Sequence, residues 1–366
     1  MFIHPQIKFN IKNLGLFFRK VSEEKLKKKL ANFFPNRHIL FTDLGRSAFQ
    51  IAIKELGLEN SEMLIPAYIC DIFKPILQHY NIKPIYLDIN LETFHADLSG
   101  IESRITPQTK SILICHTYGL PVEMDKILEI ARKYNLKIIE DCAHLPIGLP
   151  RTQLRGDCAF FSFAKLFPVV NGGMLVSKNP IKTELPKYKP RLFNVIRFLR
   201  LFPVLAKISE LFRKAGGENL KNNREEKPKK ISKKSLKALN YYLDNYQNQI
   251  SKRINLAEYF QKKLKAMGFE VQEFKNNAFT YLSALVPKNI NRDELVYKLK
   301  KKNIFCSRIW QNPLFNGLPN TSETSKRIIN LPMQNWFTLD DIDKVIKFLK
   351  IVISENKPIS PVPKFF

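Results

Sequence analysis

The chain has 366 residues, of which 45% are hydrophobic and 25% are charged, a composition typical of a folded protein rather than a disordered one. A chain of this length can bury one large core and is long enough for two domains. Sixty basic residues against 33 acidic ones give a formal net charge of +27, which attracts polyanions such as nucleic acid, anionic lipid or phosphorylated substrates. Charge alone does not choose among these partners.

The cysteines and the apolar runs restrict the class of protein further. Residues 1–20 contain no long apolar run and no small-residue cleavage site, and no window of about 18 uncharged apolar residues follows them. We therefore expect a cytoplasmic protein without a spanning helix. The cysteines contain no CxxC pair, which argues against a disulfide framework or a metal site; they are Cys70, Cys115, Cys142, Cys158 and Cys306.

The first predicted elements are an amphipathic helix over 22–34, whose lysines form a solvated face, and a strand over 39–44. The strand leads through Gly45-Arg46-Ser47-Ala48 into a helix over 49–56. A turn that opens a helix offers free backbone N–H groups, a hydroxyl and a cation at the positive helix end, which is the chemistry of a phosphate site. Taken alone, the turn is explained more simply as an ordinary helix N-cap.

Strands and helices then alternate along the chain. This βαβα order predicts a parallel sheet with helices on both faces. Polar residues that follow such strands gather at the carboxyl edge of the sheet, where ligands bind, and Asp88, His116 and Asp141 are expected there. The predicted strands cover 63–66, 84–88 and 111–116, and the predicted helices cover 70–80, 98–105 and 124–134.

The stretch over 136–177 carries the chemistry. An apolar run over 136–139 ends in Glu140 and Asp141, which predicts a buried strand with a carboxylate at its end. Lys165 follows among aromatic residues, where poor hydration favours the neutral amine, a nucleophile toward carbonyl groups. Gly172-Gly173 then precedes a strand. Pyridoxal phosphate needs a lysine and an acid of this kind. The plainer alternatives are a lysine that extends to water and an acid that caps a helix.

Residues 185–235 interrupt the alternation. Within them, 190–215 is apolar and dotted with arginine, which fits either a helix lying on an anionic membrane or one packed against a partner or the core. A polar loop over 216–234 and a helix over 235–267 follow. Beyond these, strands over 278–286 and 306–309 and helices over 292–301 and 339–353 predict a small α+β domain. We place the domains at 1–250 and 251–366.

In this order and spacing, the motifs resemble the DegT-like sugar aminotransferases, which are pyridoxal phosphate enzymes of fold type I. The resemblance covers residues 36–180 closely and 235–353 more loosely. It implies a mainly parallel, seven-stranded type of sheet flanked by helices. The motifs that carry it are Gly45-Arg46-Ser47-Ala48, Ile65-Pro66-Ala67-Tyr68, Pro84-Ile85-Tyr86-Leu87-Asp88, His116-Thr117-Tyr118-Gly119, Ile139-Glu140-Asp141-Cys142-Ala143-His144, Gly156-Asp157, Phe161-Ser162-Phe163, Lys165 and Gly172-Gly173.

The resemblance also assigns roles to residues. Lys165 matches the Schiff-base lysine, Asp141 the acid that pairs with the pyridinium nitrogen, and His144 the residue that contacts the phenolic oxygen. Cys70 falls where an aromatic residue often stacks on the cofactor ring, with Tyr68 as the alternative in a shifted register. The full set of expected cofactor-binding residues is Gly45, Arg46, Ser47, Cys70, His116, Asp141, His144, Ser162 and Lys165.

The function implied by the resemblance is amino transfer from an amino acid, expected to be glutamate, to a nucleotide-linked keto-sugar in the biosynthesis of a cell-surface polysaccharide or a related sugar. The resemblance also implies a homodimer. Two other functions remain open: sugar deoxygenation on the same fold, and a basic, non-catalytic membrane-associated relative. A nucleic-acid partner is not expected, because no sequence signature beyond charge supports one.

Two features depart from the family pattern. Ser162 and Lys165 are three positions apart, where the common pattern has five. The usual Asn-Tyr-Arg segment, which reaches into the partner's active site, is not recognisable, and residues 185–235 replace it. The identity of the sugar and its nucleotide is therefore left open by the sequence.

Overall fold

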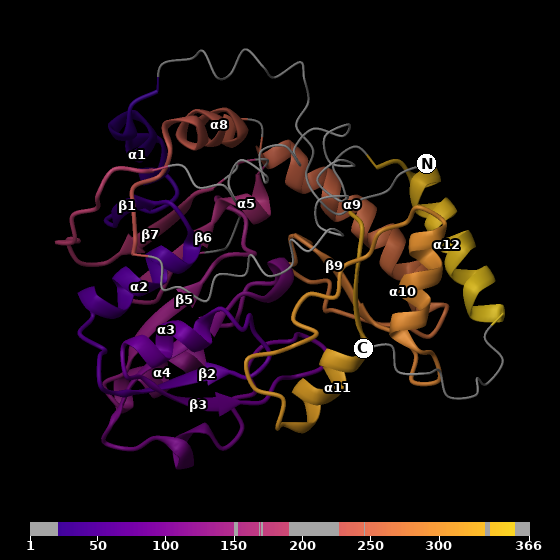
Figure 1. The fold of residues 1–366 in the computed structure, drawn as a ribbon, viewed down its shortest axis with the longest axis horizontal. Coiled ribbons are helices and arrows are strands. Elements are labelled where there is room, and N and C mark those ends of the chain that lie inside the picture. Colours follow the sequence, from indigo (N-terminus) through magenta and orange to yellow (C-terminus); the bar gives the residue numbers. More distant parts are fainter. Residues whose placement is uncertain are drawn as a thin grey trace.

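The computed structural model describes residues 21–149, 153–167, 169, 171–189, 227–244, 246–333 and 337–355. Two sheets organise these residues, as Figure 1 shows: a seven-stranded sheet on the left of the view and a three-stranded sheet on the right. The predicted 190–215 helix and most of the predicted 216–234 loop lie outside the described residues. Within the described part, no helix is both long enough and apolar enough to cross a membrane.

The large sheet has the order β1-β7-β6-β5-β4-β2-β3 and is parallel except for β7, which runs antiparallel to both of its neighbours. The mainly parallel α/β fold predicted from the sequence is therefore confirmed. The apolar strands of its centre are buried on both faces, as parallel strands require. The strands are β1 (His38–Thr42), β2 (Glu62–Pro66), β3 (Lys83–Leu87), β4 (Thr109–Cys115), β5 (Lys137–Asp141), β6 (Cys158–Ser162) and β7 (Gly173–Ser177).

Helices cover both faces of this sheet. Alternate residues of each strand enter separate apolar cores, so that Phe160 of β6 packs with α2 and α3, while Phe161 packs with α1 and α8 on the other side. A further cluster joins α4 to β4 and β5. The helices are α1 (Glu23–Ala31), α2 (Gly45–Glu55), α3 (Phe73–His79), α4 (Asp125–Lys133), the single turn α5 (Phe163–Leu166) and α8 (Lys233–Asp244).

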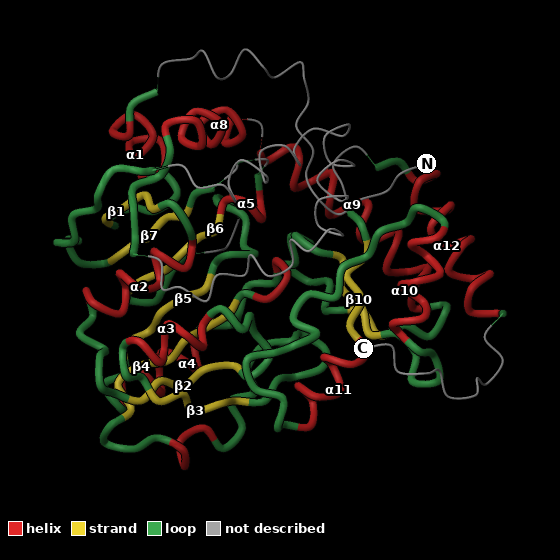
Figure 2. The backbone as a smooth tube through the Cα atoms, in the orientation of Figure 1, coloured by secondary structure: helices red, strands yellow, loops and turns green. Residues whose placement is uncertain are grey.

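The second sheet has the order β10-β9-β8 and forms its own core with the C-terminal helices, which Figure 2 shows in red beside it. The predicted helix over 235–267 corresponds to α8 and α9, and residue 245 between them lies outside the described residues. The division into two domains near residue 250 remains a prediction. The elements are α9 (Tyr246–Lys265), β8 (Glu270–Val271), β9 (Leu282–Leu285), α10 (Arg292–Lys301), α11 (Pro319–Arg327), β10 (Ile328–Leu331) and α12 (Leu339–Ser354).

Two predicted elements are wrong. The helix expected over 98–105 is one short 3-10 turn, Ile101–Arg104, because Gly100 before it adopts a left-handed φ of +64° and Pro107 follows closely. The strand expected over 306–309 makes only one bridge, from Ser307 to Asn330, and ends where Trp310 turns the chain at a φ of +61°. The sequence analysis also missed α11 and β10 and made the strand at 278–286 too long.

Candidate active site

The carboxyl edge of the large sheet brings the chemical motifs together. β7 begins at this edge, where Gly173 pairs with Thr42 of β1 on one side and with Ser162 of β6 on the other. A Cβ atom at Gly173 would lie only 2.4 Å from the backbone carbon of Leu44, so glycine is required for the close approach of α2 to the sheet. This packing sets the N-terminus of α2 beside Ser162.

The start of α2 has the features of a phosphate site. Its N-cap residue, Leu44, forms no side-chain hydrogen bond with the helix, so the N-cap position itself places no polar side chain over the first turn. A Cβ atom at Gly45 would lie 2.9 Å from Cβ of Ser162, so this glycine keeps the backbone open toward that serine. Arg46 lies in the same first turn. The Ser47 hydroxyl instead donates a 2.7 Å hydrogen bond to Oδ1 of Asp43, so in this conformation it is directed at a carboxylate rather than at the expected phosphate position.

Lys165 lies one turn beyond Ser162, within α5. Its Nζ is 3.0 Å from Nε2 of His144, although the two residues are 21 positions apart in the sequence. The lysine is half-buried and the histidine is buried. The sequence therefore identified two residues that meet in space, although it treated Lys165 as part of a loop rather than a helical turn.

Asp141 ends β5 in the same region and is buried. Burial raises the pKa of Asp141, while the charge of Lys165 and a 2.8 Å hydrogen bond from the backbone N–H of Ala143 act in the opposite direction. The Cys115 thiol, 3.9 Å from Oδ2, donates weakly to the same carboxylate. Since Asp141 interacts electrostatically with Lys165, one site contains an acid, an amine and an imidazole.

Cys70 interacts electrostatically with Lys165 and Asp141, whereas Tyr68 does not offer a free ring face. Burial raises the pKa of the Cys70 thiol and the charge of Lys165 lowers it, which places the thiol within electrostatic range of the lysine. The Tyr68 ring is fully buried, and its hydroxyl lies 2.8 Å from that of Tyr118. Of the two registers considered for the stacking position, the geometry favours Cys70.

The prediction that His116 binds the cofactor is not supported by the structure. Glu140 and Asp141 are neighbours in a strand, so their side chains leave opposite faces of the sheet, and His116 pairs with Glu140. His116 Nε2 lies 3.0 Å from Glu140 Oε2, and Nδ1 accepts the N–H of Val122 at 3.0 Å. Both ring nitrogens are therefore occupied by protein partners.

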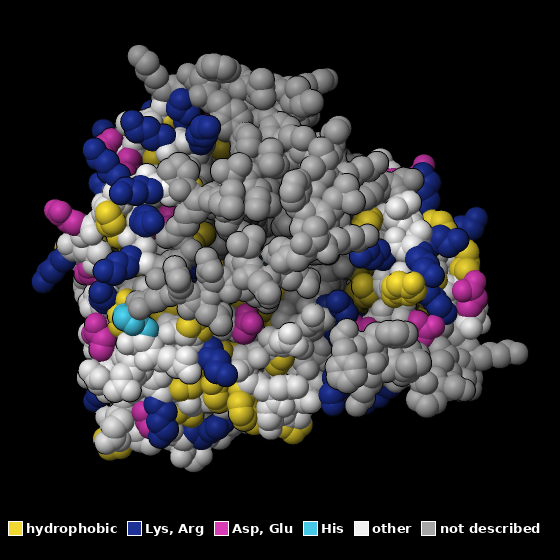
Figure 3. Space-filling view, viewed as in Figure 1, with side chains coloured by type: hydrophobic (Ala, Val, Ile, Leu, Met, Phe, Trp, Pro, Cys, Tyr) yellow, Lys and Arg dark blue, Asp and Glu magenta, His cyan; other side chains and the backbone are white. Residues whose placement is uncertain are grey.

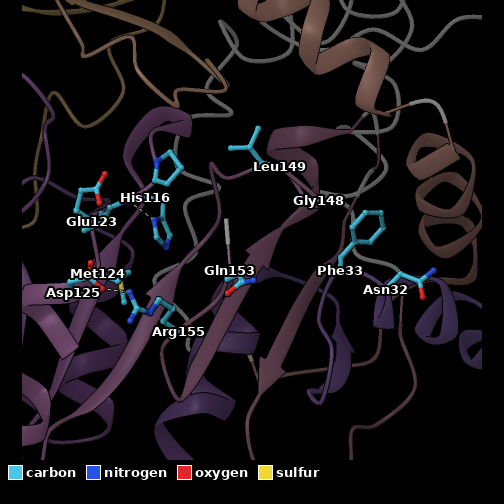
Figure 4. A pocket seen from close by; sticks show the side chains of 12 residues that line it. Asn32, Phe33, His116, Glu123, Met124, Asp125, Gly148, Leu149, Gln153 and Arg155 are labelled. Carbon is cyan, nitrogen blue, oxygen red and sulfur yellow. Dashed lines mark hydrogen bonds and ion pairs between the residues drawn. The ribbon is translucent and has the colours of Figure 1, made fainter. Parts of the chain in front are cut away.

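His116 lines a separate cavity of about 570 Å³ (Figure 4). Figure 4 shows its ring near the segment that carries Glu123 and Met124, while Arg155 forms an ion pair with Asp125 at the same cavity. Lys165 and His144 are not among the lining residues. This cavity is therefore distinct from the site at Lys165.

Asp88 is not part of the site either. Its Oδ1 accepts hydrogen bonds from the backbone N–H and the hydroxyl of Thr321, at 2.8 and 2.9 Å, and its Oδ2 accepts the backbone N–H of Asn320. Asp88 thus supplies the N-terminal cap of α11, whose own N-cap residue, Leu318, has no polar side chain.

The distances within the described residues would allow one metal-ligand cluster, formed by His116, Glu140 and Cys142. The hydrogen bond from Val122 to Nδ1 of His116 places the proton of a neutral ring on Nε2, the atom that faces the other two residues. Burial also raises the pKa of the Cys142 thiol well above its ordinary value, which opposes formation of a thiolate ligand. His116 and Glu140 therefore form a hydrogen-bonded structural pair next to a buried thiol rather than a cation site.

Three aromatic residues around His144 were missed by the sequence analysis. Trp310 and Tyr118 lie nearly parallel to the imidazole, with ring centroids 5.1 and 5.6 Å from it, and Tyr281 meets it edge-on at 5.0 Å. Tyr118 belongs to a motif quoted above but was given no role. No local signal marked Trp310, because it is 166 positions from His144 and only the tertiary structure joins them.

Comparison with known proteins defines the family. The profile of the DegT/DnrJ/EryC1/StrS aminotransferase family matches residues 17–350. The chain belongs to this family. Membership confirms the predicted enzyme class, an aminotransferase that uses pyridoxal phosphate. The cradle at Gly45, Gly173 and Ser162, together with Asp141 and Lys165, fits such a cofactor.

Relatives and solved structures agree with this membership. The chain is 27% identical over 354 residues to the dTDP-4-amino-4,6-dideoxy-D-glucose transaminase of Shigella dysenteriae, and the match covers 89% of each chain. It is 26% identical to the 3-oxo-glucose-6-phosphate:glutamate aminotransferase of Bacillus subtilis, over 91% of this chain and 76% of that one. The fold matches a sugar aminotransferase of Streptococcus pneumoniae in its PMP form, with a TM-score of 0.74, 16% identity and coverage of 97% and 99%.

Proposed function

We propose that this enzyme transfers an amino group from an amino acid, most simply glutamate, to a keto-sugar linked to a nucleotide. The observation that carries the proposal is the meeting of Lys165, His144 and Asp141 beside the start of α2. An amine, an acid and an anion-binding helix end at one sheet edge are the groups that pyridoxal phosphate requires. The proposed product is an amino sugar for a cell-surface polysaccharide or a related glycan.

Each residue has a role that follows from its position. When bound, pyridoxal phosphate supplies an aldehyde that links to amines and a ring that withdraws electrons. The backbone N–H groups at Gly45 and Arg46 and the Ser162 hydroxyl would hold its phosphate, and Asp141 would hold a proton on its ring nitrogen. In the first half-reaction Lys165 Nζ would take the proton from the donor Cα and deliver it to the aldehyde carbon of the cofactor, and in the second it would move a proton in the reverse direction onto the sugar carbon.

The names of relatives support the two substrates. The Shigella relative is named for a dTDP-linked sugar, and the Bacillus relative is named for glutamate as the amino donor and for a sugar phosphate. Both acceptors carry phosphate, and the excess of basic over acidic residues in this chain favours such ligands. We also propose a homodimer that works in the cytoplasm, with peripheral contact to the inner face of the membrane through residues 190–215.

The decisive experiment compares the absorption spectra of the wild type and Lys165→Ala after addition of pyridoxal phosphate. The wild type should show a band at about 420 nm, from cofactor bound covalently through Lys165, which borohydride removes. Glutamate should shift this band to about 330 nm as the amino group is transferred. Lys165→Ala should lack the borohydride-sensitive covalent link, and Lys83→Ala, at an exposed lysine outside the site, serves as the matched control.

The result distinguishes the proposed function from its alternatives. A wild-type protein that fails to bind pyridoxal phosphate would contradict the proposed enzymatic function and favour a non-catalytic, membrane-associated role. A protein that binds the cofactor through Lys165 but does not react with any amino acid would favour an enzyme of another reaction type on the same fold. Amination of dTDP-, UDP- and GDP-linked keto-sugars, compared side by side, then identifies the acceptor.

A further inference from the structure

His144 presents a defined side of its ring to Lys165. Its Nδ1 accepts the backbone N–H of Tyr118 at 3.3 Å. A backbone amide always carries its hydrogen, so Nδ1 must be unprotonated for this bond to form. In the neutral ring the proton then lies on Nε2, the atom 3.0 Å from Lys165 Nζ, and this N–H can donate to Nζ when the lysine is an uncharged amine, because an ammonium has no lone pair to accept it.

The surroundings of the ring favour its neutral form. Burial lowers the pKa of His144 well below its ordinary value, and the charge of Lys165 lowers it further. The titratable groups facing the ring are Lys165 from α5, Tyr118 from the turn after β4, and Tyr281 before β9. The site therefore holds a neutral imidazole whose Nε2–H can donate a hydrogen bond to an acceptor atom beside Lys165.

One side chain from the C-terminal part of the protein covers this imidazole. The Trp310 ring lies within 24° of parallel to both His144 and Tyr118, with centroids at 5.1 and 5.3 Å. Such offset stacking is favourable for aromatic pairs and excludes water from the ring face. Trp310 is itself 9% exposed.

Several contacts fix Trp310 in this position. The carbonyl of Ile309 accepts hydrogen bonds from the hydroxyls of Tyr68 and Tyr118, both at 3.1 Å, and its N–H donates to Oδ1 of Asn330 at 2.6 Å. Trp310 also adopts a left-handed φ of +61°, which is rare for a bulky residue and persists where surrounding contacts enforce it. These bonds hold the backbone next to Trp310, and the stacking on His144 and Tyr118 holds the indole itself.

We propose that Trp310 is a positioning residue that holds His144 as the Nε2–H tautomer, directed at Lys165. It acts through the imidazole and takes no part in proton transfer itself. The inference rests on the proposed function for its chemical meaning, since a fixed Nε2–H donor matters where the cofactor and Lys165 meet. It concerns the protein's own side chains, so it can be tested without the cofactor.

The first test is NMR of cofactor-free protein labelled with ¹⁵N-histidine, in which nitrogen shifts report the tautomer of each ring. The signals that disappear in His144→Gln are those of His144 among the six histidines, and exposed His38 serves as an internal reference for a solvated ring. In the wild type and Trp310→Phe, His144 should remain Nε2–H and should not titrate between about pH 5.5 and pH 8. Trp310→Leu, which lacks a flat ring, should show both tautomers and a pKa moved toward about 6.5.

The second test uses the rate of the glutamate half-reaction. Trp310→Leu should slow it by about tenfold or more, with Trp310→Phe retaining most of the rate. In the His144→Gln background the same Leu substitution should have little further effect, because its target ring is gone. A purely structural role for Trp310 would slow both backgrounds equally, and that result overturns the proposal.

Retention of a single, non-titrating tautomer in Trp310→Leu also overturns it. If that variant does not fold, Tyr68→Phe and Tyr118→Phe in one protein remove both hydrogen bonds to the Ile309 carbonyl, which frees the segment that carries the unmutated indole to shift away from His144. The proposal expects mixed tautomers there, and an unchanged His144 signal contradicts it. If the wild type keeps a single His144 tautomer but does not bind pyridoxal phosphate, the proposed function is rejected and the positioning role of Trp310 stands.

Discussion

At the scale of single residues, the neighbours Glu140 and Asp141 show how strand geometry separates two identical chemical groups. Glu140 Oε1 accepts the backbone N–H groups of Arg155 and Gly156, and Oε2 pairs with His116, so this carboxylate is fully engaged in structure. Asp141 has fewer hydrogen-bond donors and faces Lys165. One carboxylate stabilises the fold, and the other is available for chemistry.

We expect Asp141→Asn to reduce amino transfer by at least a hundredfold, on the order of the loss of a general acid–base group, without destabilising the cofactor-free protein at neutral pH. Because burial raises the pKa of Asp141 above its unfolded value, the stability contribution of this group is present at low pH and is lost as the pH rises through the folded pKa. Asparagine has no such titration. Denaturant unfolding at several pH values should therefore show the wild type losing stability relative to Asp141→Asn toward neutral pH.

Glu140→Gln is the matched control for this prediction. It should lower stability, because it disrupts a carboxylate that accepts three hydrogen bonds in the interior. If Asp141→Asn were the less stable of the two variants at neutral pH, the assignment of Asp141 to chemistry rather than structure would be wrong.

At the scale of elements, the site depends on how closely α2 approaches β7. Gly45 and Gly173 both lie at this contact, and a side chain at either would meet backbone or Cβ atoms at less than 3.0 Å. The turn predicted at Gly45 is therefore confirmed as a helix start. Its position against the sheet depends on β7, which follows it by more than 120 positions in the sequence. The sequence placed Gly172-Gly173 beside Lys165 and could not place it beside Gly45.

Gly173→Ala should reduce the free energy of unfolding by about 1–3 kcal/mol through overpacking and should weaken cofactor binding by displacing the start of α2. Gly57→Ala is the control, since Gly57 has a left-handed φ of +62° but no atom within 4 Å of an added Cβ. This control should cost about 1 kcal/mol of backbone strain and leave cofactor binding unchanged. Equal cofactor affinity in the two variants, measured by titration of the absorption band, would contradict the prediction.

The cap on α11 is a second prediction at this scale. Asp88→Ala should cost about 1–2 kcal/mol, because three hydrogen bonds to the first turn of the helix are lost together with a favourable charge at its N-terminus. Asp97→Ala, which removes only local bonds to Ser99 on an exposed loop, should cost less. Thermal unfolding of both variants checks this, and an equal loss would show that Asp88 is not a cap.

At the scale of the whole molecule, the C-terminal part completes a site that the large sheet begins. The backbone N–H groups of Leu314 and Phe315 donate to the carbonyls of Ile69 and Ala67, next to Cys70, and Trp310 covers His144 from the same segment.

The net charge of +27 belongs to the molecule as a whole. Figure 3 shows lysine and arginine side chains gathered where α1 lies, and Lys25 and Lys28 are exposed there.

We expect the full chain to bind vesicles that contain anionic lipid at low salt and to lose this binding as salt screens the charges. Deletion of 190–215 should abolish the binding in a sedimentation assay. Reversal of charge at Lys25 and Lys28 is the control, which should weaken attraction only modestly because it leaves the apolar, arginine-rich segment intact. Undiminished binding by the deletion variant would assign the contact to the folded surface instead.

The sequence by itself determined the parallel alternation and the start of α2, and its resemblance to the family grouped Lys165, Asp141 and His144 as site candidates. These features are local, because apolar runs, helix starts and short motifs each depend on residues that are close together in the sequence. Only the tertiary structure decided which carboxylate faces the lysine, that His116 and Asp88 serve structure, and that Trp310 lies on His144. Strand alternation, helix caps and long-range stacking depend on which segments meet in space, and no spacing along the chain specifies those meetings.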